Sequence, residues 1–290
     1  MKYTNPIIPE GINVKDENQV KEFFILLFGV GIVISLLIVV LSFLAGWLVK
    51  FIPFSAEQSL VQSMPEISSI EQNIDKQTLV QQRSQLDIEN YLQQLANKLA
   101  TAQNLPSDIT ITVHYVADDT VNAFATLGGN IIIHQGLLAK FDSENTLAMV
   151  MAHEIAHIKY RHPIIAMGRG LTVGVALATI TGVSDSSFVS GILGQISLLT
   201  VLAYSREQES QADTVAYDTI INHYGHAEGA VELFEILDSF DKLIEPPKFL
   251  STHPLSIDRI EHIKSLNKLN ANSTELTLLP EFVKTATITQ

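Results

Sequence analysis

The chain has 290 residues, of which 47% are hydrophobic, with no cysteine and a formal net charge of −13. Without cysteine it can form no disulfide, no thiolate zinc site and no cysteine nucleophile. Its 18 basic side chains against 31 acidic ones argue against a nucleic-acid partner, because phosphate contacts need clustered cations.

Apolar residues are concentrated near the N-terminus. Residues 23–49 contain no charged side chain and lie between Glu22 and Lys50. At about 1.5 Å per residue, a helix of this length exceeds the ~30 Å hydrocarbon core of a bilayer. The apolar core of a cleaved signal peptide would be about half as long. We therefore predict one transmembrane helix, with the lipid bilayer as a partner.

The lysines near this helix predict its orientation. Three lysines precede the helix and only Lys50 lies close after it, which favours a short cytoplasmic segment over residues 1–22. The first fifty residues hold equal numbers of acidic and basic side chains, so the net negative charge lies in residues 51–290. We expect a single-pass protein of a bacterial inner membrane with its catalytic domain in the periplasm.

Composition divides the rest of the chain. Residues 50–84 are rich in Ser and Gln and predict a loosely structured linker that can contain helical stretches. From Leu92 to Leu99 the apolar positions recur at three and four, which is typical of an amphipathic helix at the start of a folded domain. We place this domain at residues 85–266. After the domain comes a polar tail, residues 267–290, which we expect to be the least ordered part of the domain.

The fold class follows from the order of the predicted elements. Three β-rich runs, at residues 109–116, 121–125 and 130–134, are separated by an acidic pair and a glycine pair and predict a small antiparallel sheet. Helical periodicity dominates after them. Strands followed by many helices indicate an α+β domain that is mainly helical.

The string HEIAHIKYRH begins at His153 within an apolar-periodic helix. His153 and His157 are four residues apart and share a helix face, so they can bind one Zn²⁺ at ~2.0–2.1 Å. Glu154 would then lie beside the open metal position as a general base. Two histidines that make ordinary hydrogen bonds are the alternative, but burying such groups on an apolar face is costly without compensation.

A third ligand is offered by the string SREQESQAD, residues 205–213. Glu209 and Asp213 share a helix face, so Glu209 could bind the metal while Asp213 accepts a hydrogen bond from a ligand imidazole. Glu207 competes for the ligand position. A solvated, acidic helix start explains the same string without any metal.

Four strings in this order resemble a known family, over about residues 85–266: NAFATLGGNIIIHQGLL, HEIAHIKYRH, YSREQESQAD and FLSTHPLSIDR. The family is that of the membrane-associated zinc metallopeptidases, which includes the CAAX prenyl protease and the HtpX-type bacterial membrane proteases. The resemblance implies a zincin-like fold and one Zn²⁺ per chain.

Carried over by position, the resemblance implies that His153 and His157 are zinc ligands, that Glu154 is the general base and that Glu209 rather than Glu207 is the third ligand. The chain departs from the family pattern at Ala216, where a glycine is usual. It also departs at residues 126–127, where Leu-Pro is frequent and this chain has Thr-Leu. Neither departure touches a ligand.

Two further segments have competing interpretations. His253 precedes Pro254 and a helix, so it is either a structural residue or a group above the zinc that stabilises an oxyanion or caps the metal. The strand at residues 130–134 could bind an extended peptide at a sheet edge, or lie inside the sheet. Arg161, Arg206 and His162 are interpreted as structural partners of nearby carboxylates.

Apolar residues also fill most of the stretch from 170 to 204, between the two zinc motifs. As two transmembrane spans the halves would be short. We predict a helical hairpin that packs on the catalytic helix or enters the bilayer surface.

The resemblance implies a membrane-anchored zinc endopeptidase that takes extended protein or peptide substrates. The same resemblance implies that this endopeptidase acts in quality control on misfolded or unassembled envelope proteins. The alternative hypothesis is a membrane-tethered chaperone or assembly factor whose protease site is suppressed, with His253 as the metal cap. Oligomeric state is not predicted.

Overall fold

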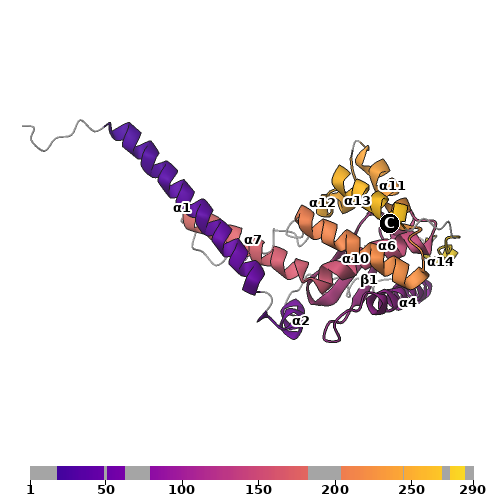
Figure 1. The fold of residues 1–290 in the computed structure, drawn as a ribbon. Coiled ribbons are helices and arrows are strands. Elements are labelled where there is room, and N and C mark those ends of the chain that lie inside the picture. The colour runs from indigo at the N-terminus through magenta and orange to yellow at the C-terminus, as the bar shows by residue number, and fades with distance from the viewer. Residues whose placement is uncertain are drawn as a thin grey trace, which may run out of the picture.

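The computed structural model describes residues 18–48, 51–62, 79–181, 204–243, 245–269 and 275–284. Most of these residues lie in helices, and the predicted mainly helical domain behind an apolar helix is confirmed (Figure 1). The elements in chain order are α1 (Gln19–Leu48), α2 (Phe54–Gln62), α4 (Leu79–Ala102), β1 (Thr112–Val116), β2 (Ala123–Ala125), the 3₁₀ turn η3 (Leu127–Gly129), β3 (Asn130–His134), α5 (Gln135–Leu138), α6 (Glu144–Lys159), α7 (His162–Thr181), α10 (Arg206–Tyr224), α11 (Ala230–Asp241), α12 (Lys248–Thr252), α13 (Ile257–Leu269) and α14 (Glu281–Lys284).

The sheet is mixed, and the predicted antiparallel sheet is wrong in this respect. Its strand order is β1-β3-β2, with β3 parallel to β1 and antiparallel to β2. The chain leaves β1, crosses to the far side of β3 and returns, so β1 and β3 run in the same direction. The strand at residues 130–134 is therefore central, and its interpretation as an edge strand is wrong. Three consecutive buried isoleucines, Ile131 to Ile133, fit a strand that is covered on both faces.

Helix α6 forms the centre of the domain. Every residue from Asn145 to Ile158 is buried, and α4, α10, α11 and β2 pack around it. The hydroxyl of Ser143 caps its N-terminus by accepting a hydrogen bond from Thr146 N. A helix so completely enclosed holds its side chains in fixed positions, which suits a site built on its surface.

Two apolar helices lie side by side outside this domain (Figure 1). In the described part of the chain, α1 is the one helix that is long and apolar enough to cross a membrane. Helix α7 runs back along α1, starting where Ile165 lies next to Gly46. Its residues 170–181 fall within the predicted hairpin, and α7 packs on α1. Residues 182–203 lie outside the described residues.

The predicted loose linker begins with a packed helix. Phe54 and Glu57 of α2 are buried, and the Glu57 carboxylate lies 3.2 Å from Arg161 Nε. Arg161 also donates a hydrogen bond to the carbonyl of Ile52. The interpretation of Arg161 as the partner of a carboxylate is confirmed, and residues 54–62 form a helical stretch of the linker that packs on the domain. The contact joins residues about a hundred positions apart, which local composition does not reveal.

Part of the polar tail, which we expected to be the least ordered part of the domain, also folds onto it. Glu144 N donates to Thr277 O, and Leu279 N donates to Asp142 O. The side-chain amide of Gln135 donates to Lys284 O in α14. Residues 275–284 therefore extend the domain beyond residue 266.

Candidate metal centre

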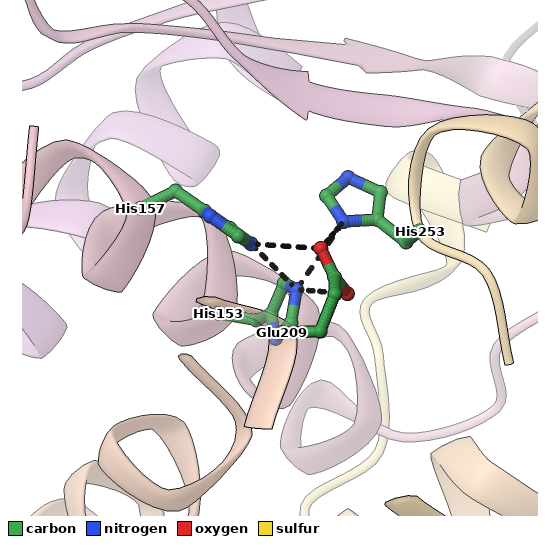
Figure 2. Close-up of side chains that lie close together, drawn as sticks. All are labelled: His153, His157, Glu209 and His253. Carbon is green, nitrogen blue, oxygen red and sulfur yellow. Dashed lines mark hydrogen bonds and ion pairs between the residues drawn. The ribbon is translucent and has the colours of Figure 1, made fainter. Parts of the chain in front are cut away.

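Helix α6 brings two imidazoles together. His153 and His157 lie one turn apart, both are buried, and their Nε2 atoms are 3.0 Å apart (Figure 2). The helix predicted for this motif and the shared face of its histidines are thus observed.

Helix α10 brings Glu209 to the same point. The Ser205 hydroxyl and the Gln208 side chain form a capping box that fixes the start of this helix. The Glu209 carboxylate lies 3.5 Å from Nε2 of both His153 and His157. Glu207, its competitor in the sequence, is exposed. The structure therefore places Glu209 beside the histidines.

His253 reaches the site from a third element, at the C-terminal end of α12. Its Nδ1 lies 3.3 Å from His153 Nε2 and 3.2 Å from Glu209 Oε1. It is 1% exposed. One ligand atom from each of His153, His157, Glu209 and His253 lies within 4.8 Å of the others, and the four are placed to form a metal site (Figure 2).

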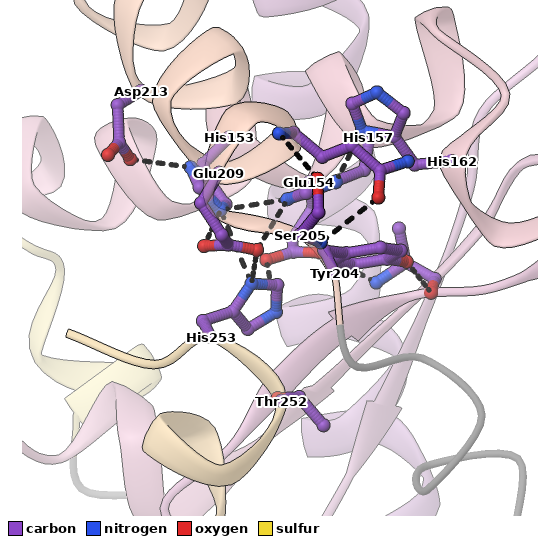
Figure 3. Close-up of polar contacts among 12 residues, drawn as sticks. His153, Glu154, His157, His162, Tyr204, Ser205, Glu209, Asp213, Thr252 and His253 are labelled. Carbon is purple, nitrogen blue, oxygen red and sulfur yellow. Dashed lines mark hydrogen bonds and ion pairs between the residues drawn. The ribbon is translucent and has the colours of Figure 1, made fainter. Parts of the chain in front are cut away.

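The Nδ1 atoms of the two α6 imidazoles make contacts that show whether a cation fits between their Nε2 atoms (Figure 3). Asp213 Oδ1 lies 3.0 Å from His153 Nδ1, and His162 Nδ1 lies 2.8 Å from His157 Nδ1. When each ligand ring donates its Nδ1 proton outward, both Nε2 lone pairs point at each other and at Glu209. Two Nε2 atoms only 3.0 Å apart, each with its lone pair turned inward, repel each other and the nearby carboxylate unless a cation lies between them. The donor set, nitrogen and carboxylate oxygen, is the one that Zn²⁺ takes.

Protons and a metal compete for this cluster. Burial lowers the pKa of His153, but hydrogen bonds to Asp213 and Glu209 outweigh burial and raise it to about 10. Burial lowers the pKa of His157 far below its usual value. Burial raises the pKa of Glu209, yet His253 and His153 hold it well below its ordinary value. A proton on His153 thus stands where a metal would bind, and metal binding must release it.

Glu154 lies beside this cluster, with one carboxylate oxygen held by a hydrogen bond and the other facing His253. Oε2 accepts a hydrogen bond of 2.7 Å from the backbone N–H of Ala125 in β2, and Oε1 lies 3.3 Å from His253 Nε2. Burial raises the pKa of Glu154, and the facing His253 and His153 oppose the shift. A raised pKa makes this carboxylate a stronger proton acceptor.

Three side chains contribute to this site in ways that were not predicted from sequence. His162 contacts the His157 ring, so its interpretation as the partner of a carboxylate is wrong. Tyr204 stacks on His157, with ring centroids 3.9 Å apart. Arg259 lies 2.8 Å from Glu209 and 2.7 Å from Asp213. Tyr204 and Arg259 both stand inside the strings that carried the resemblance, but their contacts depend on the tertiary fold.

Comparison with known proteins agrees with this geometry. Residues 87–267 match the model of peptidase family M48. The chain is 30% identical over 190 residues to a putative beta-barrel assembly-enhancing protease of Vibrio cholerae, which covers 60% of this chain and 38% of that protein. It is 33% identical over 161 residues to the mitochondrial metalloendopeptidase OMA1 of Schizosaccharomyces pombe, covering 54% and 47% respectively.

A third relative is the metalloprotease YcaL of Escherichia coli, 30% identical over 153 residues, which covers 52% of this chain and 59% of that protein. The chain thus spans less than two thirds of the length of each of these relatives. Each match is to a protease by name.

Proposed function

We propose, because this chain belongs to peptidase family M48, a family of zinc metallopeptidases, that it is a membrane-anchored endopeptidase acting on misfolded or unassembled envelope proteins. The observation that carries the proposal is the convergence of four buried ligand atoms from three elements beside Glu154. In this proposal His153, His157 and Glu209 hold the zinc. When bound, zinc supplies Lewis-acid chemistry, which lowers the pKa of water and polarises a carbonyl.

Glu154 is the general base of the proposed reaction. Its Oε2 is fixed by the N–H of Ala125, so Oε1 is the oxygen that takes a proton from the attacking water. The same oxygen then returns the proton to the leaving amine. The raised pKa of Glu154 favours uptake of the proton from water, and its return is favourable because the leaving amine is a stronger base than the carboxylate.

The substrate is proposed to bind as an extended chain along β2. In the sheet of the described residues β2 is the edge strand on the side of Glu154. An extended peptide added at this edge is recognised through main-chain hydrogen bonds, which depend little on sequence. Misfolded or unassembled proteins offer such extended segments. The bias of lysines around α1 favours a periplasmic catalytic domain on a bacterial inner membrane.

A second candidate function is a membrane-tethered chaperone or assembly factor with a suppressed protease site. The position of His253 favours it, since this ring lies at hydrogen-bond distance from His153 and Glu209 and contacts Glu154. A third imidazole on the metal would take the place that water needs. Helix α12, which precedes His253, is also fixed next to β2, because the backbone N–H of Phe249 donates a hydrogen bond to the carbonyl of Val121.

Cleavage of an unfolded protein by the detergent-solubilised full chain distinguishes the two functions. We expect wild type to cleave casein, Glu154→Gln to keep its zinc but lose cleavage, and His253→Ala to cleave at least as well as wild type. A wild type that binds zinc but stays inert, and an equally inert His253→Ala variant, would exclude the protease.

A further inference from the structure

Arg259, on the first turn of α13, lies behind the metal cluster and is 5% exposed. We infer that Arg259 is the positioning residue of the zinc site, a role that rests on the proposed function. Through one guanidinium it holds the ligand Glu209, the histidine partner Asp213 and the segment that carries His253.

The contact with Asp213 is a bidentate fork. Arg259 Nε donates to Asp213 Oδ2 at 2.7 Å, and Nη2 donates to Oδ1 at 2.8 Å. Two parallel hydrogen bonds fix the plane of the carboxylate as well as its distance. Oδ1 is also the atom that faces His153 Nδ1 at 3.0 Å. Arg259 therefore sets, through Asp213, the direction in which the His153 ring points its other nitrogen.

The remaining nitrogen of the guanidinium contacts two further groups. Nη1 lies 2.8 Å from Glu209 Oε2 and donates to Pro254 O at 2.9 Å. The first contact holds Glu209 Oε2, which also lies 3.5 Å from His153 Nε2, and leaves Oε1 turned to His157. The second holds the residue that directly follows His253. One side chain from α13 thus links both carboxylates of α10 to the segment that brings in the fourth ligand atom.

The charges of the cluster support the same role. Glu154, Glu209 and Asp213 are each at most 1% exposed, and buried charges are costly unless compensated. If all three are ionised, Arg259 balances one of them and leaves two negative charges, the amount that Zn²⁺ balances. Lysine would supply the charge but not the fork, because its single ammonium cannot bind both oxygens of Asp213 and reach Glu209.

A role limited to folding would look different in an experiment. A residue that only stabilises the domain lowers the melting temperature of the metal-free and zinc-loaded proteins alike. A residue that positions the ligands changes the affinity for zinc, and so reduces the rise in melting temperature that zinc produces. The zinc-induced rise therefore separates the two roles.

The test compares Arg259→Lys and Arg259→Gln with wild type, using the full chain in detergent. Arg206→Lys, at the exposed first position of α10, is the matched control. The zinc dissociation constant is measured by competition with a chelating dye, the melting temperature with and without zinc, and the visible spectrum with Co²⁺ in place of zinc. We expect about 10- to 100-fold weaker zinc binding and an altered Co²⁺ spectrum in both Arg259 variants, as for other residues behind metal ligands. The control should match wild type.

Wild-type zinc affinity in a folded Arg259 variant would overturn the inference while the proposed function stands. Failure of both variants to fold with zinc present would also overturn it, since Arg259 would then serve the fold. A wild type without zinc affinity would instead overturn the proposed function.

Discussion

Asp213 Oδ1 lies 3.0 Å from His153 Nδ1, and this one contact determines which nitrogen of the histidine faces the metal cluster. A carboxylate can only accept, so His153 donates from Nδ1 and keeps the lone pair of Nε2 for a metal. The same carboxylate is gripped by Arg259 on its other side. His153 is thus oriented by a chain of buried contacts that runs from α13 through α10 to α6.

Replacing Asp213 by asparagine should weaken zinc binding about 10- to 100-fold, as is typical when the partner of a ligand histidine is changed. The amide keeps the shape but removes the charge that holds the His153 proton in place and pairs with Arg259. A chelator competition assay measures the change. Asp218→Asn, an exposed position on the same helix, should bind zinc as wild type does. Equal affinities in the two variants would contradict this role of Asp213.

Removing the metal should destabilise the domain, because the buried acids then lose their counter-charge. At a free zinc concentration 100 times the dissociation constant, binding stabilises the fold by about 2.7 kcal/mol. For a domain of this size that corresponds to a fall in melting temperature of roughly 5–10 °C on chelation. Thermal unfolding with chelator, and again after zinc is restored, measures it. A melting temperature that chelation leaves unchanged would argue against a structural contribution of the metal.

The connection between β2 and β3 depends on Gly129. Its φ is +82°, and a Cβ atom there would lie 1.9 Å from the carbonyl oxygen of Thr110. Gly129→Ala should therefore destabilise the domain by more than the ~1–2 kcal/mol that a left-handed conformation costs an alanine. Gly225→Ala is the control, because Gly225 has a φ of +79° but open space around it. Chemical denaturation of both variants isolates the clash; equal losses of stability would show that η3 can move aside.

The ion pair between Glu57 and Arg161 fixes the segment after α1 to the turn that follows α6. Glu57→Gln should cost on the order of 1–3 kcal/mol, as for a buried hydrogen bond to a charged group. Asp238→Asn breaks the exposed pair with Lys242 and should cost below about 0.5 kcal/mol. Melting temperatures of the two variants give the comparison. If the exposed pair proved as costly, the docking of α2 would not depend on Glu57.

The chemistry of the site was more predictable from sequence than its geometry. His153, Glu154 and His157 lie within five consecutive residues, so helical periodicity alone brings them together. Glu209 competed with Glu207 until four motifs in order indicated the family, since short spacing on one helix does not show which face meets α6. Arg259 contacts Asp213 although the two residues are 46 positions apart in the chain, and such a contact forms only when the helices pack.

The sheet shows the same limit. Its three strands were predicted from β-branched residues and turn signals, which are local. Strand order and direction depend on where the connection between β1 and β2 crosses β3, and on pairing between distant residues. The run Ile131 to Ile133 did carry a signal for a central strand, because it lacks the polar alternation of a half-exposed edge. The packing of α2 was not predicted for a comparable reason, since α2 contacts η3 and Arg161, which are both distant from it in sequence.

The position of bound zinc decides whether the proposed catalytic centre is correct. Anomalous diffraction at the zinc absorption edge, from crystals of the full chain, should give one strong peak between His153 Nε2, His157 Nε2 and the Glu209 carboxylate. A zinc-loaded, active protein whose peak lies elsewhere, or that gives none at this point, would contradict the proposed catalytic centre.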